Sequence, residues 1–171
     1  MRLFIIGFVS LFFFFGCSTH YPPLQTVKKV DINSYLGEWY EIARYEHFFE
    51  KGCSDAKATY SLKENGEINV LNECIKEGKL SQAKGVAYAT DATNAKLKVS
   101  FFRPFYGNYW ILMLGENYEY ALVGEESREY LWILSRENSI SQELKTTILK
   151  KLPELGYTQD KLVWTQQRGE L

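Results

Sequence analysis

The chain has 171 residues, enough for one domain with a buried core behind a short leader. Its formal net charge of −1 argues against a nucleic-acid-binding surface, which normally carries a basic excess. The two histidines, His20 and His47, leave little scope for histidine-based metal or triad chemistry, so we expect no metal site. Aromatic residues make up 16% of the chain, and many of them must be buried or line a cavity.

Residues 1–16 have the pattern of a bacterial secretion signal. A positive start is followed by the apolar stretch 3–15, which is shorter than the roughly 20 residues that span a bilayer. The stretch stops at Gly16-Cys17, which resembles the lipobox of bacterial lipoproteins, where the cysteine receives a diacylglycerol group. Phe14 and Phe15 depart from the residues preferred there, and an ordinary cleaved signal with an incidental cysteine is the alternative.

We expect residues 17–30 to form the lipidated cysteine and a tether, and residues 31–171 to form the folded domain. Ser18 stands where an inner-membrane retention signal typically has Asp, so the resemblance favours the outer membrane, facing the periplasm. Two or three acyl chains anchor a protein firmly, whereas one binds only marginally. The sequence therefore predicts membrane attachment through acyl chains on Cys17.

Cys53 and Cys74 remain once Cys17 is lipidated. Between them, residues 58–62 and 67–71 flank the turn signal Asn65-Gly66, a pattern typical of a β-hairpin. Both cysteines lie near the open end of this hairpin, where paired strands bring Cα atoms within disulfide range. An oxidising periplasm favours a disulfide between them, and two buried thiols that never meet are the alternative.

Short strands follow one another along the folded body, after a short helical turn at residues 31–35. We expect them at residues 39–45, 58–62, 67–71, 85–90, 96–101, 109–114, 118–124 and 130–135. Eight sequential strands with short connections indicate an all-β, antiparallel up-and-down barrel, because closure removes exposed strand edges. A barrel of this size is just wide enough for one small ligand.

A helical period follows the eighth strand. It predicts a C-terminal helix over residues 141–154 that packs on the barrel wall through Leu144, Ile148, Leu149, Leu152 and Leu155. Ser139 and Gln142 are expected to form a capping box at its start, and Pro153 and Gly156 mark its end. A last short strand is expected at residues 161–165.

Three ordered blocks resemble the lipocalin family: the motif Gly37-Glu38-Trp39-Tyr40, residues 98–109 and residues 130–136. More narrowly, the chain resembles the bacterial outer-membrane lipoprotein lipocalins, the apolipoprotein D-like subgroup. The resemblance implies that Trp39, after Gly37, closes the floor of the barrel and that Arg136 stacks across it in a cation–π contact. The family's middle motif, Thr-Asp-Tyr, is replaced by Gly115-Glu116-Asn117.

If Arg136 points inward, the two-residue period of a strand sends Trp132 and Leu134 inward too. We expect a ligand pocket lined by Tyr60, Val70, Val99, Phe101, Tyr109 and Trp132, with plain core filling as the alternative for each. Residues 101–106 are expected to form a loop at the barrel mouth or a strand bend.

The resemblance implies a protein without a cofactor that binds and stores or transports hydrophobic ligands, such as fatty acids or lysophospholipids. A structural lipoprotein with a filled barrel is one alternative, and a tetrapyrrole or retinoid ligand is another. An enzyme would need a nucleophile and a base, yet the chain has no Gly-x-Ser-x-Gly elbow and almost no histidine, so we expect no catalysis. The sequence does not indicate which ligand binds or whether two copies form a homodimer.

Overall fold

The structure is a computed structural model, and it describes residues 22–169. The predicted signal, the lipidation site Cys17 and part of the tether lie outside these residues. The strands pair in the order β2-β3-β4-β5-β6-β7-β8-β1-β9, and a further β1–β2 pairing closes β1 to β8 into an antiparallel barrel. No helix within residues 22–169 has the length and apolar character needed to cross a membrane.

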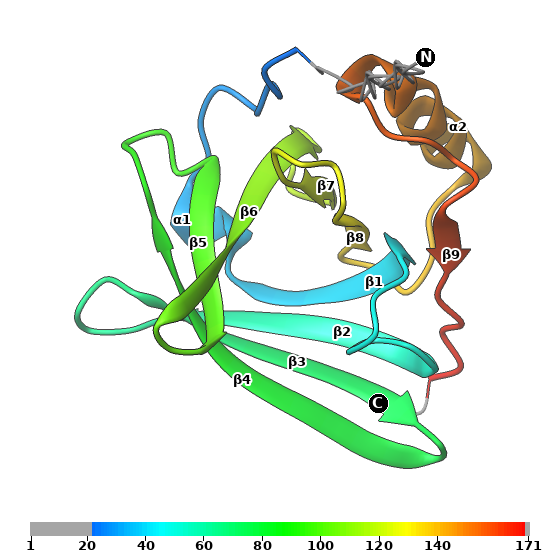
Figure 1. The fold of residues 1–171 in the computed structure, drawn as a ribbon, viewed down its shortest axis with the longest axis horizontal. Coiled ribbons are helices and arrows are strands. Elements are labelled where there is room, and N and C mark those ends of the chain that lie inside the picture. Colours follow the sequence, from blue (N-terminus) through cyan, green and yellow to red (C-terminus); the bar gives the residue numbers. More distant parts are fainter. Residues whose placement is uncertain (1–21, 170–171) are drawn as a thin grey trace, which may run out of the picture.

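Figure 1 shows the barrel from one end, with α2 on the outside of its wall. Within residues 22–169, the first element is α1 (Ile32–Tyr35), whose N-terminus is capped by the Asp31 side chain. The strands are β1 (Gly37–Tyr45), β2 (Cys53–Leu62), β3 (Ile68–Lys76), β4 (Lys79–Ala89), β5 (Lys96–Phe102), β6 (Phe105–Leu114), β7 (Tyr120–Gly124) and β8 (Leu131–Ser135). The C-terminal part contains α2 (Gln142–Lys151), the 3-10 helix η1 (Pro153–Leu155) and β9 (Leu162–Trp164).

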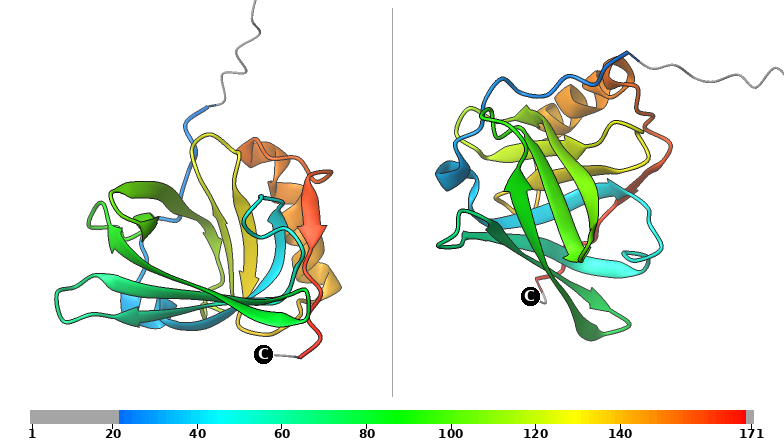
Figure 2. Two further views of the ribbon diagram at one scale, coloured as in Figure 1. Left: turned by 60° about the horizontal axis from the view of Figure 1, so that its bottom comes forward. Right: turned by 60° about the vertical axis from the view of Figure 1, so that its left-hand side comes forward.

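The predicted eight strands and the helix on the wall are confirmed, but several boundaries were wrong. Strands β2, β3 and β4 are longer than expected. In β4, the additional residues 79–84 pair with β3 but stay exposed, so they carry no apolar pattern from which a strand could be predicted. Figure 2 shows the β3–β4 hairpin reaching beyond the other strands. Strand β7 starts at Tyr120 instead of Tyr118, since Tyr118 has a φ of 60° and belongs to the preceding turn.

The start of α2 also differs from the prediction. Ser139 and Gln142 do not form the capping box, because Gln142 is already the first helical residue. Ser141 is the N-cap, and its hydroxyl accepts a hydrogen bond from the Leu144 amide at 3.1 Å. The helix therefore begins on the serine that immediately precedes it.

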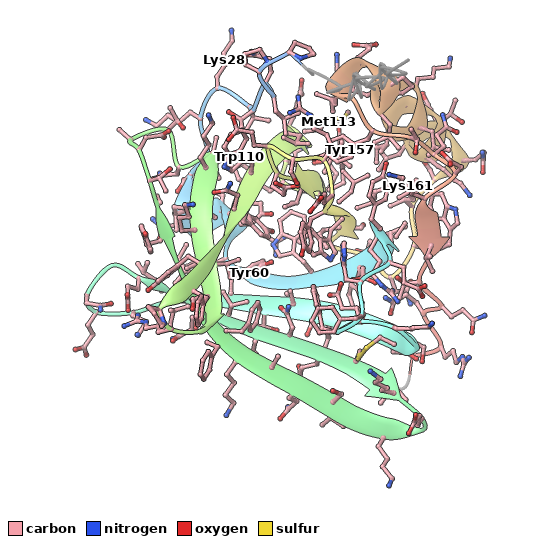
Figure 3. The ribbon with its side chains drawn as sticks, in the orientation of Figure 1. Lys28, Tyr60, Trp110, Met113, Tyr157 and Lys161 are labelled. Carbon is pink, nitrogen blue, oxygen red and sulfur yellow. A yellow bond between two sulfur atoms is a disulfide. The ribbon has the colours of Figure 1, made fainter. Side chains whose placement is uncertain are left out.

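Two apolar clusters lie on opposite sides of the wall. Strand β8 contributes residues to both clusters, since Trp132 and Leu134 face the barrel interior while Leu131 and Ile133 face α2. The outer cluster buries Ile148 and Leu152 completely, together with Tyr157, which Figure 3 shows between the wall and the C-terminal helix. Helix α2 therefore packs on the outer face of the wall, and its side chains do not fill the barrel interior.

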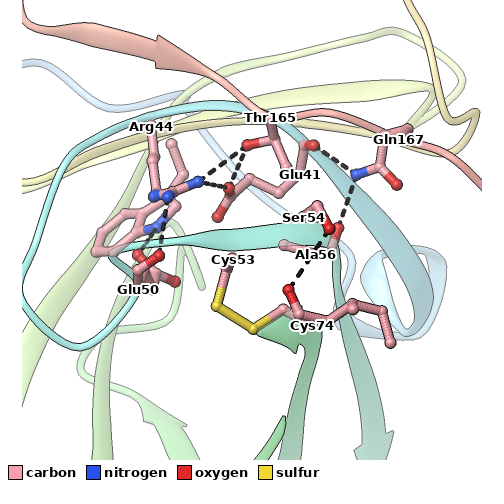
Figure 4. A network of polar contacts seen from close by, with 11 residues as sticks. Glu41, Arg44, Glu50, Cys53, Ser54, Ala56, Cys74, Thr165 and Gln167 are labelled. Atoms are coloured by element: carbon pink, nitrogen blue, oxygen red, sulfur yellow. Dashed lines mark hydrogen bonds and ion pairs between the residues drawn. A yellow bond between two sulfur atoms is a disulfide. The ribbon is translucent and has the colours of Figure 1, made fainter. Parts of the chain in front are cut away.

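The C-terminal segment covers a gap between strands β1 and β2. Strand β1 pairs with β2 only over residues 37–40, and beyond this point the two strands diverge. Strand β9 pairs with β1 at residues 43–45, and Gln167 then spans the gap (Figure 4). The Gln167 amide donates to the Glu41 carbonyl at 2.8 Å and to the Ala56 carbonyl at 3.0 Å.

Candidate ligand cavity

The barrel encloses a cavity of about 830 Å³. Its wall is mainly apolar and aromatic, and residues from α1, from β1 to β6 and from β8 contribute to it. The six residues expected from the sequence, Tyr60, Val70, Val99, Phe101, Tyr109 and Trp132, all line this cavity. Phe101 is 46% exposed, so only part of its ring faces the interior. That any of the six contacts a ligand stays a prediction.

Trp39 and Arg136 form the floor, at the closed end of the barrel. Trp39 is completely buried, and the Arg136 guanidinium carbon lies 3.8 Å from the centroid of its ring. The guanidinium also donates hydrogen bonds to four main-chain carbonyl oxygens, those of Ser34, Leu36, Glu38 and Tyr118. These carbonyls belong to the α1–β1 segment and the β6–β7 turn, so one side chain ties both closing segments together. Gly37, expected beside this pair, has a φ of 92°, and a Cβ there would lie 3.4 Å from the Arg136 guanidinium.

At the opposite end, which we call the mouth, residues 46–52 connect β1 to β2 and residues 125–130 connect β7 to β8. They meet where the rings of His47 and Tyr130 stack with centroids 4.2 Å apart. Phe49 and Trp132 extend this stack on either side, and Phe48 beside it is 88% exposed. Burial and the nearby Arg44 charge lower the pKa of His47, so its ring is neutral near pH 7.

A buried polar group lies in the wall below the mouth (Figure 4). Arg44 is 2% exposed and forms an ion pair with Glu41 at 2.7 Å. Its other terminal nitrogen donates to the Glu50 carbonyl at 2.9 Å, and Thr165 bonds to the same Glu41 carboxylate. The Glu50 carboxylate accepts a hydrogen bond from the Trp132 indole at 3.2 Å and lines the cavity.

Glu50 is the second carboxyl group beside a single guanidinium. Burial raises the pKa of Glu50 to about 7, and the negative charge of Glu41 adds to this. The Trp132 hydrogen bond and the Arg44 charge act in the opposite direction without restoring the ordinary value. The cavity therefore contains a carboxyl group that changes charge near neutral pH.

The disulfide between Cys53 and Cys74 is confirmed, with Cα atoms 5.5 Å apart. Both cysteines line the cavity at the end of the β2–β3 hairpin that leads to residues 46–52. Residues 101–106 form a tight hairpin turn with a cis Arg103–Pro104 bond. Arg103 in this turn pairs with Glu67 of the β2–β3 turn at 2.7 Å.

The comparisons with known proteins agree with this architecture. The family model of the lipocalin-like domain matches residues 30–167. This chain is a lipocalin. It is 44% identical over 165 residues to the outer membrane lipoprotein Blc of Escherichia coli (strain K12), covering 94% of this chain and 93% of that protein. It is 39% identical to temperature-induced lipocalin-1 of Arabidopsis thaliana, covering 87% of this chain and 86% of that protein.

Solved structures show the same fold at lower identity. Insecticyanin from the tobacco hornworm Manduca sexta matches with a TM-score of 0.71 and 18% identity, covering 86% of each chain. The bacterial relatives, which are named outer membrane lipoproteins, support an outer-membrane location for this lipocalin. Its family and fold support binding of a small hydrophobic molecule.

Sequence reasoning missed two sets of residues at the cavity of this lipocalin. One is Glu41 and Glu50, which line the cavity, with Arg44 as the ion-pair partner of Glu41. A signal for it was present, since Glu41 and Arg44 are charged residues that flank the apolar pair Ile42-Ala43 in β1. The other is Tyr35, which packs 4.9 Å from Trp39 and lines the cavity. Its place at the end of a four-residue helix gave no indication of an inward orientation.

Proposed function

We propose that this lipocalin is anchored in the outer membrane, faces the periplasm, and binds and stores or transports a hydrophobic ligand such as a fatty acid or a lysophospholipid. The observation that carries this proposal is the cavity of about 830 Å³ with its mainly apolar wall. At about 25 cal/mol per Å², burying roughly 400 Å² of an acyl chain gains on the order of 10 kcal/mol before the costs of binding. A cavity of this size argues against the alternative of a barrel filled by its own side chains.

We propose binding without turnover. Hydrolysis of a lipid would require a nucleophile next to a base at the cavity. No histidine is among the described residues that line the cavity, and the two cysteines that line it form a disulfide with each other. Ligand stored in this cavity would therefore leave it chemically unchanged.

Native mass spectrometry of the purified protein tests the proposal most directly, because it reports bound lipid, its mass and the number of associated chains together. We expect lipid at one molecule per chain. Titration of delipidated protein with hexadecanoic acid or its lysophospholipid should change Trp132 fluorescence, and Trp132→Phe removes that signal. Absence of bound lipid and of any fluorescence change would refute ligand binding, and release of a hydrolysis product would refute binding without turnover.

The anchor has its own test. Cys17→Ala should release the protein from membranes and leave ligand binding intact, since the cavity is built from residues 32–134. Cell fractionation followed by ligand titration checks both points. Membrane retention of the variant would contradict the proposed lipidation.

A further inference from the structure

Three tyrosine hydroxyls meet at the inner end of the cavity, beside the floor. Tyr35 comes from α1, Tyr60 from β2 and Tyr109 from β6, and all three line the cavity. The Tyr109 oxygen lies 2.7 Å from that of Tyr35 and 3.1 Å from that of Tyr60. Figure 3 shows Tyr60 in the interior of the barrel. We call these three residues the tyrosine cluster.

The cluster has one more hydrogen-bond donor than its protein partners can use. Three hydroxyls supply three O–H donors, but only two hydrogen bonds join them. None of the three hydroxyls has a further protein partner within residues 22–169. Whichever way the protons are arranged, one O–H is left without a protein acceptor, and lone pairs on the hydroxyl oxygens stay unused.

The residues that carry this surplus donor are buried (Tyr35 and Tyr60) or half-buried (Tyr109), and their hydroxyls do not ionise. Burial raises the pKa of Tyr60 to about 12 and raises the pKa values of Tyr35 and Tyr109 as well. The O–H groups are therefore retained at any physiological pH. Apolar side chains such as those of Ile68, Val70 and Leu97 form the adjoining wall and offer no acceptor. A buried donor without an acceptor is costly, so the site favours an incoming oxygen atom.

The hydroxyls are also held in place before any ligand arrives. The Tyr35 and Tyr60 rings stack with centroids 5.8 Å apart, and the Tyr109 ring meets Tyr60 edge-on at 6.2 Å. The Trp39 indole donates to the Tyr35 carbonyl at 2.9 Å, which fixes the end of α1 against the floor. Donors that are already oriented bind an acceptor with little additional loss of conformational entropy.

We propose that the tyrosine cluster is a hydrogen-bonding subsite for an oxygen atom at the buried end of the ligand. The cavity then selects acyl chains whose inner end carries a hydroxyl, carbonyl or carboxyl oxygen over chains that end in a plain methyl group. This inference rests on the proposed function, because it concerns the orientation and inner end of a ligand in the same cavity.

Matched pairs of ligands test the subsite. Dissociation constants are measured by calorimetry for dodecanoic, tetradecanoic and hexadecanoic acids and for the same acids with a hydroxyl on the terminal carbon. A series of lengths ensures that some chain reaches the cluster. Burying a hydroxyl against an apolar floor weakens binding roughly tenfold or more. We expect instead that, at the best chain length, wild-type protein binds the hydroxy acid at least as tightly as the plain acid.

Tyr109→Phe removes the central hydroxyl of the cluster, and Tyr88→Phe is the matched control because Tyr88 is exposed and does not line the cavity. We expect Tyr109→Phe to shift the affinity ratio at least tenfold against the hydroxy acid, and Tyr88→Phe to leave it unchanged. If Tyr109→Phe, but not the control variant, binds the plain acid tenfold more weakly, the carboxyl oxygen of that acid lies at the cluster. This result would also support the subsite. Weaker binding of the hydroxy acid by wild-type protein at every length, or no change of either affinity in Tyr109→Phe, would overturn the proposal.

A crystal structure of the wild-type protein with the best hydroxy acid provides a test that needs no variant to fold. A ligand oxygen within hydrogen-bonding distance of the cluster supports the subsite, and an alkyl segment against the three hydroxyls overturns it. Failure of all the acids to bind would refute the proposed function itself. Binding of the plain acids without any effect of Tyr109→Phe would refute only the subsite.

Discussion

The floor and the mouth end of the barrel each contain an arginine, but the two side chains balance their charge differently. Arg136 at the floor donates to four main-chain carbonyls and stacks on Trp39, and no carboxylate pairs with it among the described residues. Arg44 below the mouth is buried with Glu41 as its ion-pair partner and Glu50 next to it. One end is therefore held by neutral acceptors and the other by ionisable ones.

Because of this difference, we expect the stability of the mouth end, but not that of the floor, to depend on pH. The floor combines carbonyl dipoles with tyrosines whose pKa values are raised, so its hydrogen bonds do not change near neutral pH. The mouth end contains Glu50, whose pKa is raised to about 7. We therefore expect substitutions at the floor to act equally at all moderate pH values, and those at the mouth end to act in a pH-dependent way.

The largest expected effect is at the mouth end. Arg44→Met would leave the Glu41 carboxylate buried without its partner, and this should lower the free energy of unfolding by about 3–5 kcal/mol. Urea unfolding at pH 7 measures the loss. The double variant Arg44→Met, Glu41→Leu should recover much of it, because no buried charge then remains. A loss below about 1 kcal/mol in the single variant would show that Glu41 does not depend on Arg44.

The disulfide is next in size. Replacing Cys53 and Cys74 with serine opens a loop with a sequence separation of 21 residues. The expected loss is about 3 kcal/mol, mainly through the greater entropy of the unfolded chain. Thermal unfolding of the variant and of the wild type, each with and without reductant, checks this. Reductant should lower the melting temperature of the wild type alone, and equal responses would contradict the prediction.

Glu50→Gln should have a pH-dependent effect that reaches its full size only near neutral pH. The folded protein raises the pKa of Glu50 from 4.5 to about 7, so folding is most favoured with the proton bound. Wild-type stability should fall relative to the variant as pH rises between these values, by about 3 kcal/mol in total, and the difference should level off above pH 7. Unfolding curves for both proteins at a series of pH values measure it. A difference that does not vary with pH would show that Glu50 titrates normally.

The smallest effect is expected at the floor. Arg136→Lys keeps the positive charge but cannot bond to four carbonyls at once, so a loss of about 1–2 kcal/mol is expected. Water can reach the carbonyls that are left, which is why the loss is smaller than for Arg44. The loss should be the same at pH 6 and pH 8. A strong pH dependence would contradict the contrast between the two ends.

Much of the fold followed from the sequence. Strict alternation in residues 96–101 predicted β5, and the Asn65-Gly66 turn predicted the hairpin that contains the disulfide. The family motifs indicated the contact of Trp39 with Arg136. Strand boundaries were less accurate at residues 79–84, because an exposed strand carries no apolar period.

The sequence by itself determined the barrel, the helix on its wall and an aromatic interior, because period and turn chemistry are local properties of the chain. Only the tertiary structure decided the polar groups inside. A bulge between Glu41 and Ala43 brings the side chains of Glu41 and Arg44 to the same side of β1, although simple alternation would separate them. Tyr35, Tyr60 and Tyr109 meet only because barrel closure brings three distant segments to one point. Such groupings depend on long-range register, and no local pattern in the chain encodes it.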